Sequence, residues 1–253
     1  MLSADRITYR IGETSVVAET SLEVYAGEFI AVVGPNGAGK TTLLAMLAGE
    51  LSPTSGTVFL EGEPLGELPL AERARRRAYL PPSQLNEMAF TVRDVVTMGR
   101  HPWRSHSLAD DELVEAAMRA AGVEVLADRV FSSLSTGEAQ LAQIALILAQ
   151  DTALFLLDEP TAGLDIAHQE RVLETLRLMT RGSQAVVAVI HDLNAAVSVA
   201  NRILVMSQGS TVAVGSPSEV LNDALLSEVY AHSIAVVDHP FREGPLILLR
   251  SKT

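Results

Sequence analysis

The sequence predicts an α/β fold built around a parallel β-sheet. Short continuous apolar runs, EFIAVV (28–33), ALFLLD (153–158) and AVVAVI (185–190), are typical of strands that are buried on both faces. A segment of helical composition follows each run, and strands that alternate with helices indicate a parallel sheet with covered faces. The chain has 253 residues, 48% of them hydrophobic and 20% charged. This is an ordinary globular composition and enough chain to bury a large core.

The first thirty residues are expected to be rich in strands, and a further strand is expected at 56–62. RITYRI (6–11) and TSVVAETSLEVY (14–25) alternate between apolar and polar residues, and GTVFLEG (56–62) is a short apolar run between turns. A helical segment, LLAMLAGE (43–50), follows the strand at 28–33. From 68 to 78 the pattern is helical and basic, and 78–92 is expected to be an extended loop because of Pro81-Pro82.

Residues 83–150 give only helical signals, at about 92–99, 109–121 and 137–150. Beyond them we expect a helix at about 165–181, a strand at 185–190, a helix in DLNAAVSVA (192–200) and a strand pair that turns at Gln208-Gly209. We therefore predict a single domain, 1–253, in which 1–82 and 151–253 form the core and 83–150 form an inserted helical subdomain.

The charge balance bears on possible partners. The chain has 19 basic and 31 acidic residues, a net charge of −12, and such a surface repels a nucleic-acid backbone. We expect no nucleic-acid partner. The basic run RARRR (73–77) is expected to be a solvated helix face, with a local anion site as the alternative. There is no cysteine, which excludes disulfides and Cys-based metal sites.

A glycine-rich loop carries the strongest functional signal. GPNGAGKT (34–41) fits G-x-x-x-x-G-K-[ST] and stands between a predicted strand and a predicted helix, the context that this phosphate-binding motif requires. Lys40 would reach the β- and γ-phosphates, and the Thr41 hydroxyl would ligate Mg²⁺. We predict a nucleoside triphosphate site formed by Gly34, Pro35, Asn36, Gly37, Ala38, Gly39, Lys40, Thr41 and Thr42.

Two acids and a histidine are expected at the same edge of the sheet, because the carboxyl ends of parallel strands meet there. Asp158 and Glu159 end the run LFLLDE, and His191 follows the strand at 185–190. Asp158 would support the Mg²⁺, and Glu159 would act as general base on the attacking water. A neutral imidazole at His191 could hydrogen-bond the γ-phosphate, although a lone histidine at a strand end is often only structural.

The stretch LSTGEAQ (134–140) has two local interpretations. Ser135 and Glu138 have the spacing of a capping box, which would simply start a helix. Gly137 in the first turn would also leave backbone N–H groups accessible to an anion. These residues alone leave both possibilities open.

The ordered motifs GPNGAGKT, LSTGE, LFLLDEP, AGLD (162–165) and VIHD (189–192) together resemble those of ABC-type ATPases. The resemblance implies a P-loop NTPase with a RecA-like mixed sheet core, an N-terminal antiparallel β subdomain and an inserted α-helical subdomain. It also implies an ATP-sandwich homodimer, in which the Walker A loop of one copy and the signature of the other hold each ATP. The signature residues are Ser135, Thr136, Gly137 and Glu138, and Asp165 lies in the D-loop.

Within that family, FTVRDVVTMGRHPW (90–103) and LLSEVYAHSIAVVDHP (225–240) resemble the ATP-binding subunits of heme importers. This finer resemblance implies two integral membrane permease subunits, a substrate-binding protein and a peripheral position on the cytoplasmic face of the bacterial inner membrane. Import of an iron-siderophore or of vitamin B12 is the alternative. A soluble ABC ATPase of iron–sulfur assembly, or a nucleotide-binding subunit with little turnover, is a further alternative.

The sequence departs from the family pattern at four places. Pro82 stands where the Q-loop glutamine is usual, so we expect Gln84 to take over its contact with Mg²⁺. Thr136 replaces a glycine of the signature and narrows the approach of a phosphate. Leu141 and Leu146 replace two arginines of the signature helix. The aromatic residue that stacks on adenine falls by spacing at Ile11, so either Ile11 or Tyr9 is expected to contact the base.

Overall fold

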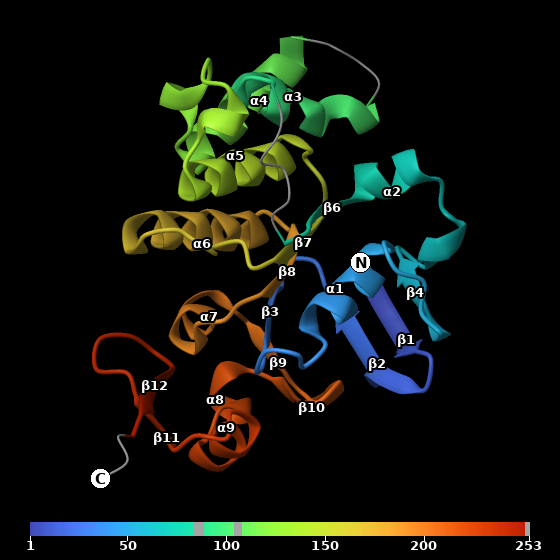
Figure 1. Cartoon of the computed structure of the whole chain (residues 1–253), viewed down its shortest axis with the longest axis vertical. Helices are drawn as coiled ribbons and strands as arrows, with labels where there is room; N and C mark the ends of the chain where they lie inside the picture. Colours follow the sequence, from blue (N-terminus) through green and yellow to red (C-terminus); the bar gives the residue numbers. More distant parts are fainter. Residues whose placement is uncertain (83–88, 104–107, 251–253) are drawn as a thin grey trace.

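A six-stranded sheet forms the centre of the molecule. The structure is a computed structural model that describes residues 1–82, 89–103 and 108–250 (Figure 1). The strand order is β10-β9-β3-β8-β7-β6, and every neighbouring pair is parallel except β9 and β10. The strands are β3 (Phe29–Val33), β6 (Arg77–Leu80), β7 (Leu154–Asp158), β8 (Ala185–Val189), β9 (Arg202–Ser207) and β10 (Ser210–Gly215). This arrangement confirms the predicted fold class.

Alternate residues of the central strands enter two different cores. In β3, Phe29, Ala31 and Val33 belong to the core shared with the helices that follow, whereas Ile30 and Val32 belong to the core shared with the N-terminal sheet. Successive side chains of a strand point to opposite faces. Both faces of the sheet are covered, so both sets of side chains are apolar, and this explains the uninterrupted apolar run in the sequence.

The N-terminal strands form a separate antiparallel sheet, as the resemblance implies. Its order is β2-β1-β4-β5, with β1 (Leu2–Ile11), β2 (Thr14–Val24), β4 (Ser55–Leu60) and β5 (Glu63–Pro64). Helix α1 (Lys40–Ala48) supplies Leu43, Leu44 and Leu47 to the core beneath this sheet.

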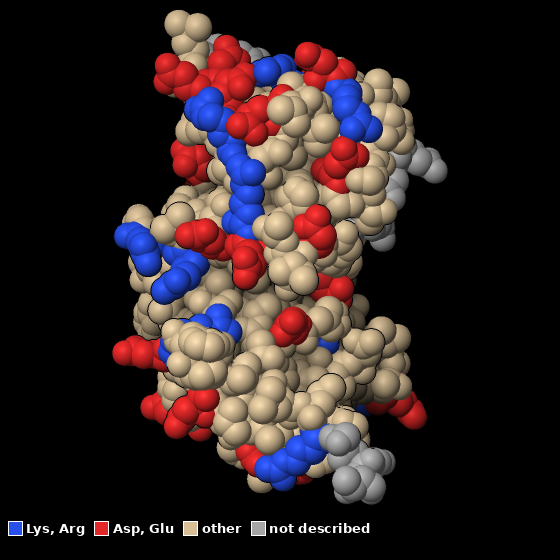
Figure 2. Space-filling view, turned by 90° about the vertical axis from the view of Figure 1, so that its left-hand side faces the viewer, with Lys and Arg blue, Asp and Glu red and all other residues tan. Residues whose placement is uncertain are grey.

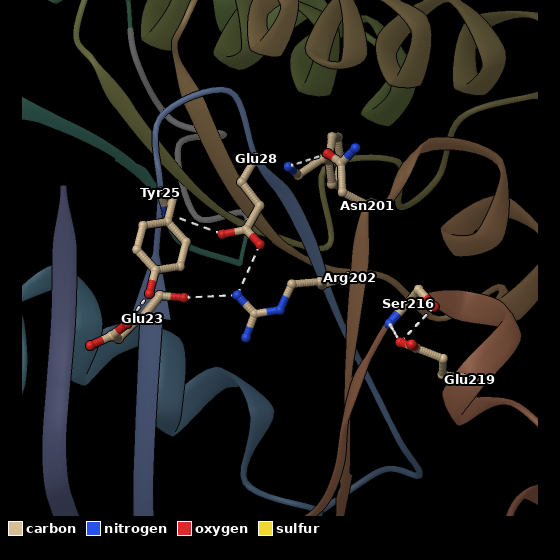
Figure 3. A network of polar contacts seen from close by, with 8 residues as sticks. Glu23, Tyr25, Glu28, Asn201, Arg202, Ser216 and Glu219 are labelled. Atoms are coloured by element: carbon tan, nitrogen blue, oxygen red, sulfur yellow. Dashed lines mark hydrogen bonds and ion pairs between the residues drawn. The ribbon is translucent and has the colours of Figure 1, made fainter.

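A polar network fixes the turn that leads from the N-terminal sheet into the central one (Figure 3). The Glu28 carboxylate accepts hydrogen bonds from the Tyr25 backbone N–H at 3.0 Å and from the Arg202 guanidinium at 2.8 Å. Arg202 also donates to the Glu23 carbonyl at 3.1 Å. Because Arg202 begins β9, the network joins the two sheets at the entry to β3.

The segment expected to be a helical subdomain contains α3 (Val92–Thr97), α4 (Leu108–Ala121) and α5 (Thr136–Ala149), with short 3₁₀ turns between them. These helices lie together at the top of Figure 1. A buried ion pair stabilises the group: Arg100 Nε lies 2.7 Å from Asp110 Oδ1. Arg100 also donates to the Ala149 carbonyl at 2.9 Å, so it satisfies the C-terminal end of α5.

The structure corrects part of the prediction for 68–92. Helix α2 spans Leu70–Arg76, but Ala78–Leu80, expected to begin a loop, belongs to strand β6, which pairs with β7. Four residues at a sheet edge are too few to show a period in the sequence. Several arginines of the basic run are bonded internally, since Arg73 donates to three backbone carbonyls and Arg77 pairs with Glu50 at 2.9 Å.

The C-terminal part completes the fold. Helix α6 (Ile166–Arg181) and helix α7 (Leu193–Val199) have the predicted positions, and β9 and β10 turn at Gln208-Gly209. Helices α8 (Pro217–Val220) and α9 (Asp223–Val229) and the hairpin β11 (Ile234–Asp238) and β12 (Pro245–Leu249) were not predicted. Asn194 of α7 both donates to and accepts from the backbone of Ile247, at 3.0 and 2.9 Å, so the hairpin is attached to α7.

Acidic and basic side chains are interspersed among uncharged residues on the face shown in Figure 2. Among the described residues, no helix is both long enough and apolar enough to cross a membrane.

Candidate functional site

Most of the residues predicted to bind nucleotide line one cavity, of about 480 Å³. It lies where β3, β7 and β8 end, because these parallel strands direct their C-terminal ends to the same edge of the sheet. The lining residues are Val16, Asn36, Gly37, Ala38, Gly39, Lys40, Thr41, Thr42, Glu159 and His191. The cavity therefore brings together residues from three of the five sequence motifs.

The loop at 34–39 requires glycine at two positions for steric reasons. A Cβ on Gly34 would lie 2.1 Å from the Met206 carbonyl oxygen, and one on Gly39 would lie 2.7 Å from the Val16 carbonyl oxygen. Gly39 has φ of 94° and precedes α1 without a side-chain cap. The first turn of α1 also holds no acidic residue, so its N–H groups present a positive end to the cavity.

Lys40 is folded back onto the loop. It is only 6% exposed, and its Nζ donates to the carbonyls of Gly34 at 2.8 Å and Pro35 at 2.9 Å. Burial lowers the pKa of Lys40, whereas the nearby Glu159 and Asp158 raise it. A phosphate that entered the cavity would offer the ammonium group stronger, charge-assisted acceptors than these neutral carbonyls.

Asp158 is a buried carboxylate with unused bonding capacity. The residue is 1% exposed, and neither Oδ atom makes a hydrogen bond of normal geometry to another described residue. Burial raises the pKa of Asp158, and the nearby Thr41 hydroxyl partly offsets this. A carboxylate and a hydroxyl are ligands that Mg²⁺ prefers. This pair of side chains fits a magnesium ion.

Glu159 and His191 point toward each other across the cavity edge. His191 Nε2 lies 2.6 Å from Glu159 Oε1. Glu159 has φ of 51°, which is uncommon for a residue other than glycine and costs about 1–3 kcal/mol. Its backbone N–H donates to the Val189 carbonyl at 3.2 Å, so the strained turn is tied to the neighbouring strand.

The stretch at 134–140 forms the capping box that its spacing predicts. Ser135 Oγ accepts from the Glu138 N–H at 3.3 Å, and Glu138 Oε2 accepts from the Ser135 N–H at 2.8 Å. The hydrogen bonds from the Ser135 backbone and side chain lower the pKa of Glu138. Ser135, Thr136, Gly137 and Glu138 do not line the cavity of their own chain. Ser135 and Thr136 are exposed.

Asp165 caps another helix outside the cavity. Its carboxylate accepts from the His168 N–H at 2.9 Å at the start of α6. This backbone bond, together with the His168 side chain, lowers the pKa of Asp165.

The predicted base contacts are not among the cavity residues. Tyr9 packs against the core of the N-terminal sheet, and Ile11 is 64% exposed. Val16 of β2 lines the cavity instead, a position that was not predicted. Only the close approach of β2 to Gly39 identifies it, and that approach has no local sequence signal. Gln84 lies outside the described residues.

The two leucines that replace basic residues on α5 have a structural explanation. Leu141 is 4% exposed, and Leu146 packs against the same core. Both side chains therefore contribute apolar packing to the helical segment. Thr136 faces the loop after β7, since its Cγ2 lies 3.3 Å from the position of a Cβ on Gly163.

Comparison with known proteins relates this geometry to one family. The sequence model of the ABC transporter family matches residues 17–162. The hemin import ATP-binding protein HmuV of Nocardia farcinica is 48% identical over 235 residues, which cover 92% of this chain and 82% of the relative. The protein of the same name from Rhodococcus jostii is 45% identical over 251 residues, which cover 98% of this chain and 86% of the relative.

Solved structures share the fold. An inward-facing ABC transporter assigned to the metal-chelate type superposes with a TM-score of 0.83 at 25% identity and covers 99% of this chain and 98% of its own. The ATP-binding cassette MJ0796, a dimer in a post-hydrolysis state with ADP and phosphate bound, has a TM-score of 0.76 at 24% identity, covering 85% and 98%.

Proposed function

This chain belongs to the ABC transporter family as one of its ATP-binding proteins, and from that premise we propose that it hydrolyses ATP to power the import of hemin through a membrane transporter. The observation that carries the proposal is the single cavity in which the glycine-rich loop, Glu159 and His191 meet.

The loop at 34–39 and the start of α1 bind the phosphates. Backbone N–H groups of a glycine-rich loop at a helix N-terminus suit an anion. Lys40 leaves the Gly34 and Pro35 carbonyls and binds the β- and γ-phosphates. Charged phosphate oxygens are stronger acceptors for the ammonium group than neutral carbonyls, so this exchange favours binding of the triphosphate.

Thr41 and Asp158 are the residues that would hold magnesium. Thr41 would supply its hydroxyl, and Asp158 would supply carboxylate oxygens that lack hydrogen bonds of normal geometry to other described residues. When bound, the ion neutralises charge on the phosphates. The proposed further contact through Gln84 involves a residue outside the described part of the chain.

Glu159 is the general base that orients and deprotonates the attacking water. His191, whose Nε2 lies 2.6 Å from Glu159 Oε1, orients the carboxylate and hydrogen-bonds the γ-phosphate of ATP. Positioned proton transfer of this kind contributes about 10²- to 10⁴-fold to a rate.

Two copies of the chain act together. Ser135, Thr136, Gly137 and Glu138 lie outside their own cavity, so we assign them to the γ-phosphate of the partner copy's ATP, with Asp165 at the same interface. Two permease subunits anchor the pair at the cytoplasmic face of the inner membrane, and a substrate-binding protein delivers the cargo. In this arrangement residues 83–150 are the helical subdomain of a single domain, with 1–82 and 151–253 as the nucleotide-binding core.

Hemin as cargo is supported by relatives that carry hemin import in their names at 40–48% identity. The cargo does not touch this chain, so an iron-siderophore or vitamin B12 is the competing cargo. The test is to purify the complex that the chain forms in its own membrane and to record the spectrum of its binding protein. A Soret band supports hemin, whereas a siderophore or corrinoid spectrum identifies the competing cargo.

Hydrolysis is tested separately with the purified complex. Glu159→Gln should lower kcat at least a hundredfold while ATP still binds, because the amide cannot accept the proton. A variant that hydrolyses ATP at the wild-type rate would refute the role of Glu159. Purification without any membrane protein would favour a soluble ABC ATPase instead.

A further inference from the structure

Gln140 joins the signature helix to the strained turn that carries Glu159. It lies in the second turn of α5, five residues after Ser135, and is 4% exposed. Its Nε2 donates to the Pro160 carbonyl at 3.1 Å and lies 3.5 Å from the Glu159 carbonyl. A buried amide thus binds the backbone directly after the proposed catalytic carboxylate.

The strained backbone at Glu159 requires stabilising contacts. Glu159 has φ of 51°, and such strain persists only where the surroundings over-determine it. The Glu159 carbonyl also accepts from the Ala162 N–H at 3.1 Å, and its own N–H donates to the Val189 carbonyl. Gln140 adds a side-chain hydrogen bond to this turn from α5.

The start of the same helix packs on the rest of the loop. A Cβ on Gly137 would lie 3.3 Å from the Gly163 carbonyl oxygen and 3.6 Å from Leu164 Cδ2. Thr136 Cγ2 comes equally close to the Cβ position of Gly163. The first two turns of α5 and the loop at 159–164 therefore form one packed unit, in which close-packed groups transmit displacement.

We infer that Gln140 is a positioning residue that sets the orientation of Glu159 according to the placement of the signature helix. This inference rests on the proposed role of Glu159. It adds a connection, within one chain, between the signature helix α5 and the turn that carries Glu159. Ser135 is proposed to face the partner's ATP, and Gln140 of the same helix holds the base for the chain's own ATP.

The test uses the purified complex and two variants of Gln140. Gln140→Leu keeps a side chain of similar size but removes the donor. We expect kcat to fall at least tenfold with the Kd for ATP unchanged within twofold, since a misplaced base costs rate rather than binding. The matched control is Gln184→Leu. Gln184 donates its amide to the Thr152 carbonyl at 3.0 Å, at the opposite end of the strands, and kcat should stay within twofold of wild type.

Gln140→Glu separates positioning from packing. An ionised carboxylate cannot donate to the Pro160 carbonyl, whereas a protonated one can, and burial raises the pKa of such a carboxyl. The ratio of variant to wild-type kcat should therefore rise severalfold between pH 8 and pH 6. A flat ratio, or a Gln140→Leu variant with at least half the wild-type kcat, overturns the inference. If Glu159→Gln itself keeps full activity, the proposed function fails instead.

Discussion

His191 Nε2 lies 2.6 Å from Glu159 Oε1, although the two residues follow different strands and are 32 positions apart in sequence. The contact exists because β7 and β8 are parallel neighbours, with Asp158 opposite Val189. Each side chain leaves its strand at the same edge of the sheet. The proposed base and the proposed phosphate sensor are therefore in direct contact.

Removing His191 should lower turnover more than binding. His191→Ala deletes the partner of Glu159 and the proposed γ-phosphate contact, and we expect kcat to fall about a hundredfold with ATP affinity changed less than threefold. Steady-state ATPase rates and nucleotide titration measure the two effects. His239→Ala, on the C-terminal hairpin segment, is the control. Unchanged kcat in His191→Ala would show that Glu159 works without it.

Lys40 should control affinity. Lys40→Ala removes the buried cation that now donates to the Gly34 and Pro35 carbonyls. A hydrogen bond to a charged group contributes about 1.5–3 kcal/mol, so the Kd for ATP should rise roughly 10- to 150-fold. Titration with a fluorescent ATP analogue measures it. Lys40→Arg should not restore binding, because the side chain is 6% exposed and a larger guanidinium does not fit. Binding within twofold of wild type would contradict this role.

The ion pair of the helical segment should matter for stability. Arg100 and Asp110 are both 7% exposed at their side chains, and breaking a buried ion pair costs about 3–5 kcal/mol because the remaining charge loses its ion-pair partner. Arg100→Ala should lower the free energy of unfolding by about that amount in urea titrations. Arg93→Ala breaks the exposed pair with Glu115 and should cost less than about 1 kcal/mol. Equal effects of the two variants would exclude a special role for the buried pair.

Much of this arrangement could be predicted from local pattern. The strand at 28–33 and the loop at 34–41 are adjacent in sequence, so apolar content and glycine spacing were sufficient to place them. Parallel pairing then placed Asp158, Glu159 and His191 at the same edge of the sheet. The capping box of Ser135 and Glu138 was predictable because its two partners are three residues apart.

Contacts between distant segments were not predictable in the same way. Val16 reaches the cavity because β2 passes over Gly39, and Gln140 reaches Pro160 from 20 positions away. Strand β6 has four residues at a sheet edge, too few for a period. The hairpin of β11 and β12 depends on attachment to Asn194, a tertiary contact that overrides weak local preference.

Asp158 should reduce the stability of the nucleotide-free protein in a pH-dependent way. Burial raises the pKa of Asp158 above its value in the unfolded chain. The folded state then binds the proton more tightly, so the free energy of unfolding falls as pH rises from about 4 through the raised pKa. Asp158→Asn has no such titration. The free energy of unfolding of Asp158→Asn, relative to that of wild type, should therefore increase over that pH range. At pH 7 the difference should reach about 1 kcal/mol, which is the low end of the cost of an unsatisfied buried group.

The Asp158 carboxylate should stabilise the folded protein when magnesium and ATP bind, because the cation then offsets its buried charge. Thermal unfolding at pH 7 should therefore show a larger rise in Tm on adding ATP with Mg²⁺ for wild type than for Asp158→Asn. ATP with EDTA should reduce that difference between the two proteins. A constant stability difference between pH 4 and 7 would contradict the titration of Asp158 in the folded state. Equal Tm shifts with Mg²⁺ would remove the carboxylate from the magnesium site.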